Sequence, residues 1–194
     1  MGALEFGILG PLEVRAAGRA VPVPGAKPRA TLAVLLLHAN QAVSPDQLAL
    51  ALWGEEAPAG AGNTVQVHIS RLRKALGNTE ALTTTPGGYR LELDPDDLDA
   101  LRFDRLVAAA RGEPAATAAA TLTEALALWR GRALEDLAYE PFAQPEIARL
   151  EETRVAAYEL LCEAKLALGA HAELVGELEA LVADHPYREG CARS

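Results

Sequence analysis

The sequence predicts a mainly α-helical protein with a small β component, built from two domains. Apolar residues recur at helical spacing through most of the chain, whereas short alternating segments bounded by glycine and proline occur in the first half. The run Asp94-Pro95-Asp96-Asp97 separates this mixed half from a second half in which every pattern is helical. We therefore expect one domain over residues 1–94 and a second over residues 98–194.

The first residues predict a small antiparallel sheet. Three short, partly alternating segments within residues 4–23 are separated by Gly10-Pro11 and by Gly18, residues that favour turns. Prolines in the last segment would confine that strand to the edge of the sheet, because proline donates no backbone hydrogen bond.

Two helices and a loop should follow the sheet. The change to helical period predicts a helix over residues 27–40. Ser44-Pro45-Asp46-Gln47 then supplies an N-cap, a proline at N1 and a capping-box glutamine, so the next helix begins here and ends at Trp53-Gly54. The stretch 55–62, rich in alanine, glycine and proline, predicts a loop without regular structure.

A third helix is predicted over residues 63–76, with Asn63 as its cap and Gly77 at its end. At about 100° per residue its main apolar side chains share one narrow face. They are Val65, Ile69, Leu72 and Leu76. We expect this face to pack inward and to leave the polar and basic face free.

A hairpin is predicted after this helix, since two threonine-rich or alternating segments flank Pro86-Gly87-Gly88. Three helices and a hairpin after a small sheet describe a winged helix-turn-helix. A helix of about 10–12 Å diameter fits the major groove of B-DNA. The sequence thus predicts binding of double-stranded DNA through the third helix.

The residue types on the free face suggest individual contacts. Arg71 can donate two hydrogen bonds to a guanine edge, Gln66 can pair with adenine, and Val67 can pack on a thymine methyl group. Phosphate contacts are expected from His68, Arg73 and Lys74. Two alternatives remain open: the basic residues are an ordinary solvated face, or His68 is a flanking histidine that makes no contact.

The second half predicts antiparallel helix pairs of the tetratricopeptide kind, although no 34-residue repeat is visible. Helical patterns cover residues 98–111, 115–129, 146–168 and 172–184, with a bend over 131–145. The apolar stripe of the long helix consists of Leu150, Ala157, Leu161, Ala164 and Leu168.

Charge is distributed unevenly between the halves. Residues 1–94 hold eight basic and eight acidic residues, and residues 95–194 hold ten basic and nineteen acidic residues, which accounts for the net charge of −9. This asymmetry is typical of a binding domain joined to an acidic partner domain.

Several functional classes lack a sequence signal. No apolar run approaches the ~20 residues of a membrane span, and no export signal is visible, so we expect a cytoplasmic protein without a membrane partner. Cys162, which we expect to be buried, and Cys191 lack metal-ligand spacing, the four histidines are scattered, and no phosphate-binding lysine motif is present. We expect no catalytic residues, no metal and no cofactor.

The motifs resemble a known family. Residues 64–76 and 87–90 resemble the effector domain of OmpR/PhoB-type response regulators, and residues 6–14 and 52–55 narrow the resemblance to the Streptomyces antibiotic regulatory proteins (AfsR/DnrI/RedD type). The second half is similar to the bacterial transcriptional activation domain of that family. The segments that carry this likeness are 103–106, 124–131, 150–154, 166–169 and 185–189.

The resemblance implies an OmpR/PhoB-type winged helix-turn-helix followed by an all-α tetratricopeptide-like domain. It also implies a nucleoid-associated activator of a secondary-metabolite (antibiotic) gene cluster, which binds direct repeats near the −35 element as a head-to-tail homodimer. Such proteins recruit RNA polymerase and its sigma factor, and residues 55–62 would face the polymerase. The implied contacts of the helix are Thr64, Gln66, Val67, Ser70, Arg71 and Arg73.

The wing departs from the family pattern, because Thr85 occupies a position where relatives often carry an arginine for the minor groove. We expect the wing to contribute Thr85, Tyr89 and Arg90. The chain ends at Ser194, where the helical domain of relatives continues, so we expect this domain to be shorter. Two other functions remain open: an adaptor that acts through the acidic helical half, and a repressor that occupies a promoter.

Overall fold

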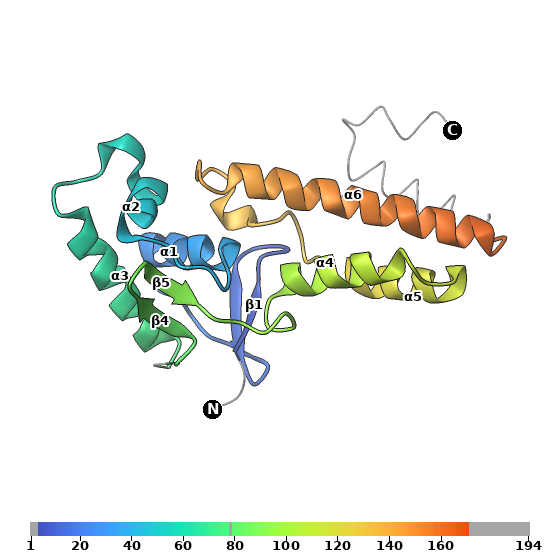
Figure 1. Ribbon diagram of the computed structural model, residues 1–194, viewed down its shortest axis with the longest axis horizontal. Helices are drawn as coiled ribbons and strands as arrows, with labels where there is room; N and C mark the ends of the chain where they lie inside the picture. Colours follow the sequence, from blue (N-terminus) through green and yellow to red (C-terminus); the bar gives the residue numbers. More distant parts are fainter. Residues whose placement is uncertain (1–3, 78, 171–194) are drawn as a thin grey trace.

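The structure is a computed structural model that describes residues 4–77 and 79–170. It is mainly helical with two small antiparallel sheets, as predicted. In Figure 1 the N-terminal strands lie between a group of three helices with a hairpin and a second, elongated group of helices.

The N-terminal sheet has three antiparallel strands in the order β1 (Leu4–Gly7), β2 (Glu13–Ala16) and β3 (Arg19–Ala20). Phe6 faces Val14 in the register of β1 and β2, and both side chains are buried. The last strand is shorter than expected, because the prolines that follow it cannot donate to a ladder.

Helices α1 (Ala26–Leu37) and α2 (Pro45–Trp53) confirm the predicted pair. The capping box at the start of α2 is formed: the Gln47 backbone N–H donates to Ser44 Oγ at 3.1 Å, and the Ser44 N–H donates to Gln47 Oε1 at 2.8 Å. These two bonds satisfy backbone donors that a helix start would otherwise leave free.

The predicted loop over residues 55–62 is wrong at both ends. Its start belongs to the 3₁₀ turn η1 (Gly54–Glu56), and α3 (Ala61–Ala75) begins before Asn63. The cap is Gly60 in the left-handed conformation (φ 83°), and its carbonyl accepts from the Asn63 N–H at 2.9 Å. The left-handed conformation of Gly60 lets the chain change direction there and enter the helix. Asn63 lies inside the first helical turn.

The predicted hairpin is confirmed as β4 (Leu82–Thr85) and β5 (Gly88–Leu91), with Thr85 facing Gly88 across a two-residue turn. On its other side β5 pairs with the segment before α2, because Tyr89 and Val43 exchange backbone hydrogen bonds of 2.9 and 2.8 Å. The hairpin is thereby fixed to the helices.

The second half contains α4 (Asp99–Ala110), α5 (Ala115–Leu126), the turn η2 (Glu135–Leu137) and α6 (Gln144–Ala167). The turn η2 lies in the predicted bend, and the helix predicted over 172–184 lies outside the described residues. Phe103 packs edge-on against Trp129 at 5.5 Å between ring centroids, and the Arg154 guanidinium lies 4.6 Å from the Trp129 ring.

The stripe of α6 is confirmed except at its end. The first four members are buried, whereas Leu168, which caps the helix, is 51% exposed. Cys162 is half-buried rather than buried. Within residues 4–77 and 79–170, none of the helices combines the length and the apolar character needed to cross a bilayer.

Candidate nucleic-acid interface

The inward face of α3 is the one that the apolar spacing predicts. Val65, Ile69, Leu72 and Leu76 have exposed fractions of at most 2%. Helices α1 and α2 pack against this face. Burying four large aliphatic side chains stabilises the position of α3 by roughly 1.5–3 kcal/mol for each. The opposite face therefore has a fixed direction.

That opposite face is exposed and uncovered. Its exposed side chains come from three successive turns, and the half-buried Thr64 lies at their N-terminal end. They are Gln66, Val67, Ser70, Arg71 and Lys74. In the part of the chain that the structure describes, Arg71 and Lys74 have neither an ion pair nor a hydrogen bond, so both charges remain available to an anionic partner.

His68 corrects one prediction. Its ring is only 7% exposed and stacks on Trp53, with ring centroids 6.1 Å apart and an interplanar angle of 26°. Burial lowers the pKa of His68, and the charges of Arg71 and Lys27 lower it further. Among the described residues neither ring nitrogen has a hydrogen-bond partner. A buried ring cannot contact a phosphate, because the C-terminal end of α2 covers this flank of α3.

Arg73 joins α3 to the wing. Its Nε donates to the Leu82 carbonyl at 3.1 Å, and its Nη2 donates to Thr84 Oγ1 at 2.8 Å. The guanidinium therefore holds the first strand of the hairpin against the end of the helix. This role was not visible in the helical pattern, since both partners belong to a later element.

The wing differs in part from the prediction. Tyr89 is only 7% exposed, because it lies on the inner face of β5, so its side chain is withdrawn from the surface. Thr85 Oγ1 donates to the Gly88 carbonyl at 3.3 Å, and Arg90 forms an ion pair with Glu92 at 3.5 Å. Both Thr85 and Arg90 are half-buried.

Lys27, at the start of α1, is a basic residue near α3 that the motifs did not single out. Its Nζ donates to the Leu52 carbonyl at 2.6 Å, at the C-terminal end of α2. A cation is stabilised at a helix C-terminus by the macrodipole. Lys27 therefore supports the C-terminal end of α2, and only its position in the folded chain reveals this.

Comparison with known proteins shows which families and relatives this chain is similar to. A family model described as "Bacterial transcriptional activator domain" matches residues 98–194, and one described as "Transcriptional regulatory protein, C terminal" matches residues 24–91. The chain is 38% identical over 201 residues to the regulatory protein DnrI of Streptomyces peucetius, with 96% of this chain and 74% of DnrI covered. The chain belongs to the Streptomyces antibiotic regulatory protein family. Members of this family are transcriptional regulators with an OmpR/PhoB-type winged helix-turn-helix.

Other relatives are longer. The transcriptional regulatory protein EmbR of Mycobacterium tuberculosis is 38% identical over 198 residues, which cover 96% of this chain and 50% of EmbR. The regulatory protein AfsR of Streptomyces coelicolor is 39% identical, with 97% of this chain and 19% of AfsR covered. A solved structure of EmbR in complex with a low affinity phosphopeptide superposes with a TM-score of 0.91 and covers 97% of this chain and 52% of that one. The chain thus spans about half the length of EmbR.

Proposed function

We propose that the protein binds specific sequences in double-stranded DNA through the exposed face of α3 and regulates transcription from the neighbouring promoter. One observation carries the proposal: four aliphatic side chains fix one face of α3 in the core, while Arg71 and Lys74 project from the other face and have no partner among residues 4–77 and 79–170. A rigid helix with free donors on its outer face suits the major groove.

The side chains have separate roles in this proposal. Arg71 reads a guanine, while Gln66 and Val67 read neighbouring bases. Lys74 neutralises phosphate, which contributes affinity but no sequence information. Further contacts at the edges of the interface come from Thr64, Ser70, Arg73, Thr85 and Arg90. His68 and Tyr89 do not belong to the contact set, since both are buried.

We further propose that the regulator is an activator of a secondary-metabolite gene cluster, which binds direct repeats near the −35 element as a head-to-tail pair. The likeness to DnrI and AfsR, both described as regulatory proteins, supports this assignment. The two functional units are residues 1–94 and 98–194. The segment 55–62, which is exposed over residues 55–60 and carries Glu55 and Glu56, is the proposed contact with RNA polymerase and its sigma factor.

The DNA-binding role is tested by selecting bound fragments from genomic DNA and measuring their affinity by fluorescence polarisation. Arg71→Ala should weaken binding to the selected site by ~1–3 kcal/mol and relax the preference at one base pair. Arg111→Ala removes an exposed charge from the helical half, so it should bind as the wild type does. Equal affinities for wild type and Arg71→Ala would refute the assigned role of Arg71.

The polymerase contact is tested separately with the double variant Glu55→Ala/Glu56→Ala. This variant should keep its affinity for DNA, since both residues belong to η1 and not to α3, and should lose most of its stimulation of transcription in a reconstituted assay. Transcription that the wild type lowers rather than raises would assign the protein as a repressor instead.

A further inference from the structure

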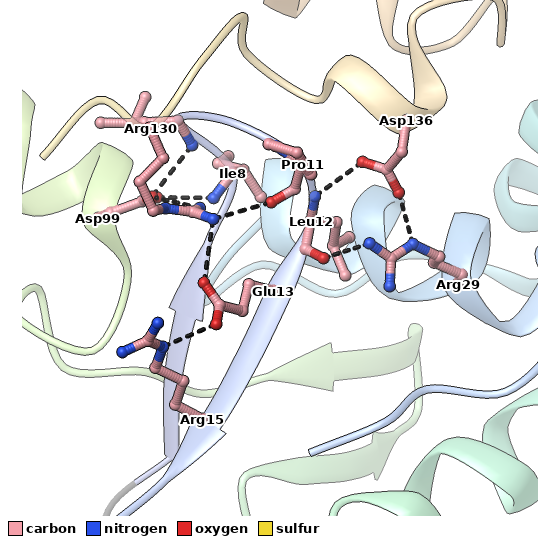
Figure 2. Close-up of polar contacts among 10 residues, drawn as sticks. Ile8, Pro11, Leu12, Glu13, Arg15, Arg29, Asp99, Arg130 and Asp136 are labelled. Atoms are coloured by element: carbon pink, nitrogen blue, oxygen red, sulfur yellow. Dashed lines mark hydrogen bonds and ion pairs between the residues drawn. The ribbon is translucent and has the colours of Figure 1, made fainter. Parts of the chain in front are cut away.

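The loop between β1 and β2 is inserted into the helical half. The Phe6 N–H donates to the Asp97 carbonyl at 2.7 Å, the Arg130 N–H donates to the Leu9 carbonyl at 2.7 Å, and the Leu134 N–H donates to the Ile8 carbonyl at 2.9 Å. The N-terminal sheet, which the sequence assigns to the first domain, is therefore bonded along its edge to the second. Figure 2 shows the polar side chains that surround this loop.

The first anchor of the loop is the pair Asp99 and Arg130. Asp99 accepts hydrogen bonds from the backbone N–H groups of Ile8 at 2.8 Å and Leu9 at 3.0 Å, and its side chain is only 13% exposed. Arg130 lies 3.3 Å from Asp99, donates to the Pro11 carbonyl at 3.1 Å and reaches Glu13 on β2 at 3.0 Å (Figure 2).

The second anchor is Asp136, in η2. One of its carboxylate oxygens accepts from the Leu12 N–H at 2.7 Å, and the other pairs with Arg29 at 2.5 Å (Figure 2). Arg29 belongs to α1 and also donates to the Leu12 carbonyl. Because α1 packs on α3, this anchor links the helical half to the DNA-facing helix through a single intervening helix.

The close approach at the first anchor requires a glycine. A Cβ atom at Gly7 would lie 2.2 Å from Nη2 of Arg130 and 3.1 Å from Oδ2 of Asp99. Any larger residue would therefore displace the guanidinium. The loop is surrounded by a joint of three carboxylates and three arginines, whose charges compensate one another: Asp99, Asp136 and Glu13 with Arg130, Arg29 and Arg15 (Figure 2).

We propose that Arg130 and Asp136 are positioning residues that hold α3 in one orientation relative to α4, α5 and α6. Two chains bound head to tail would then bring their helical halves into contact at one repeat spacing only. B-DNA turns once in about 10–10.5 base pairs, so a change of spacing rotates one rigid chain away from the other. This spacing rule rests on the proposed binding to direct repeats.

The orientation itself is tested by distance measurement between spin labels, without DNA. Labels are placed at Asp46→Cys on α2 and Ala120→Cys on α5, both exposed, in a Cys162→Ser/Cys191→Ser background. The distance distribution should be narrow in this protein and broad in Arg130→Ala/Asp136→Ala. Arg132→Ala is the matched control, since Arg132 is exposed and, among the described residues, has no ion pair or hydrogen bond. A narrow distribution in the double variant would overturn the proposal.

The spacing rule is tested with duplexes that carry one repeat or two repeats at varied separations. The double variant should bind a single repeat as the wild type does, should lose about tenfold in affinity for the tandem site, and should tolerate altered spacing. A parallel loss on single and tandem sites would overturn the positioning role. If the wild type binds no repeat at all, the proposed function and the spacing rule fail, while the label distances still decide whether the joint fixes α3.

Two further variants exclude simple misfolding as the cause. Gly7→Ala removes no polar group but displaces Arg130, so it should broaden the label distances in a chain whose circular dichroism is unchanged. Arg130→Lys keeps the charge but lacks the planar fork. It should therefore fall between the wild type and the double variant in its tolerance of altered spacing.

Discussion

His68 and Arg71 lie one turn apart on α3 in opposite environments. The His68 ring is covered by Trp53, whereas the Arg71 guanidinium projects into solvent without a partner among the described residues. The helical period separates the aliphatic stripe from its opposite face and assigns Arg71 correctly to the exposed face. The helical period does not predict whether residues on the flank, such as His68, are buried or exposed, because their burial depends on the length of the neighbouring helix.

Acid should destabilise the protein through His68. The pKa of this histidine is lowered in the folded protein, mainly by burial, while in the unfolded chain it stays near 6.5. The unfolded chain thus binds the proton more readily, and the free energy of unfolding should decrease as the pH falls below about 6.5. Urea unfolding at pH 7, 6 and 5 measures this slope.

The variant His68→Phe keeps an aromatic ring against Trp53 but cannot titrate, so the slope should become smaller. The matched control is His38→Phe, which removes another histidine and leaves the stacked pair intact. If His68→Phe and the wild type lose stability equally on acidification, His68 is not the titrating group.

At the scale of elements, α3 and the wing form one unit although the sequence presents them as two motifs. Arg73 donates to both Leu82 and Thr84, and Val43 exchanges backbone bonds with Tyr89. Gly88 allows this contact, since a Cβ there would lie 2.1 Å from the Val43 carbonyl oxygen. The hairpin turn is predictable from local residues, but its attachment depends on residues outside the hairpin: Arg73 in the preceding helix, and Val43 before α2.

Arg73→Ala should loosen the wing. Losing both hydrogen bonds of the guanidinium should lower the free energy of unfolding by ~1–2 kcal/mol. It should also speed hydrogen exchange at the amides of β4. Lys74→Ala serves as the control, because Lys74 is exposed and adjacent. Unchanged exchange in β4 after Arg73→Ala would show that the arginine does not hold the wing.

Gly88→Ala should lower the free energy of unfolding more than Arg73→Ala does, because the Val43 backbone carbonyl cannot move aside as a side chain can. Urea unfolding is expected to show a shift to lower denaturant concentration. Gly62→Ala provides the comparison, since a Cβ at Gly62 meets nothing within 4 Å. Equal stability of the two variants would contradict the close packing of β5 against Val43.

At the scale of the whole molecule, the N-terminal sheet belongs structurally to both halves. The family match to the DNA-binding module covers residues 24–91. The strands and loop before it are bonded to Asp97 in the connecting segment and to Asp99 and Arg130 in the helical half. The acidic second half thus supplies carboxylates that accept hydrogen bonds from backbone N–H groups of the first half. Burial raises the pKa of Asp99, and those N–H donors together with Arg130 act in the opposite direction.

Asp99→Asn should destabilise the whole chain. An amide has one acceptor oxygen where the carboxylate has two, so the Ile8 or Leu9 N–H would lose its partner in a site that is 13% exposed. The expected cost is ~1–3 kcal/mol. Thermal unfolding measures it, and Asp94→Asn, at an exposed position before the helical half, is the control. Identical melting of Asp99→Asn and wild type would show that the two N–H groups do not depend on this carboxylate.

By itself the sequence determined the helices, the capping box of α2, the hairpin and the inward stripe of α3, because helical period, caps and turns are local properties of the chain. It did not determine that His68 and Tyr89 are buried, that Arg73 binds the wing, or that Asp99, Arg130 and Asp136 join the halves. These features depend on which elements lie side by side, and contacts between residues up to 124 positions apart leave no periodic pattern in the chain. The tertiary structure decided them.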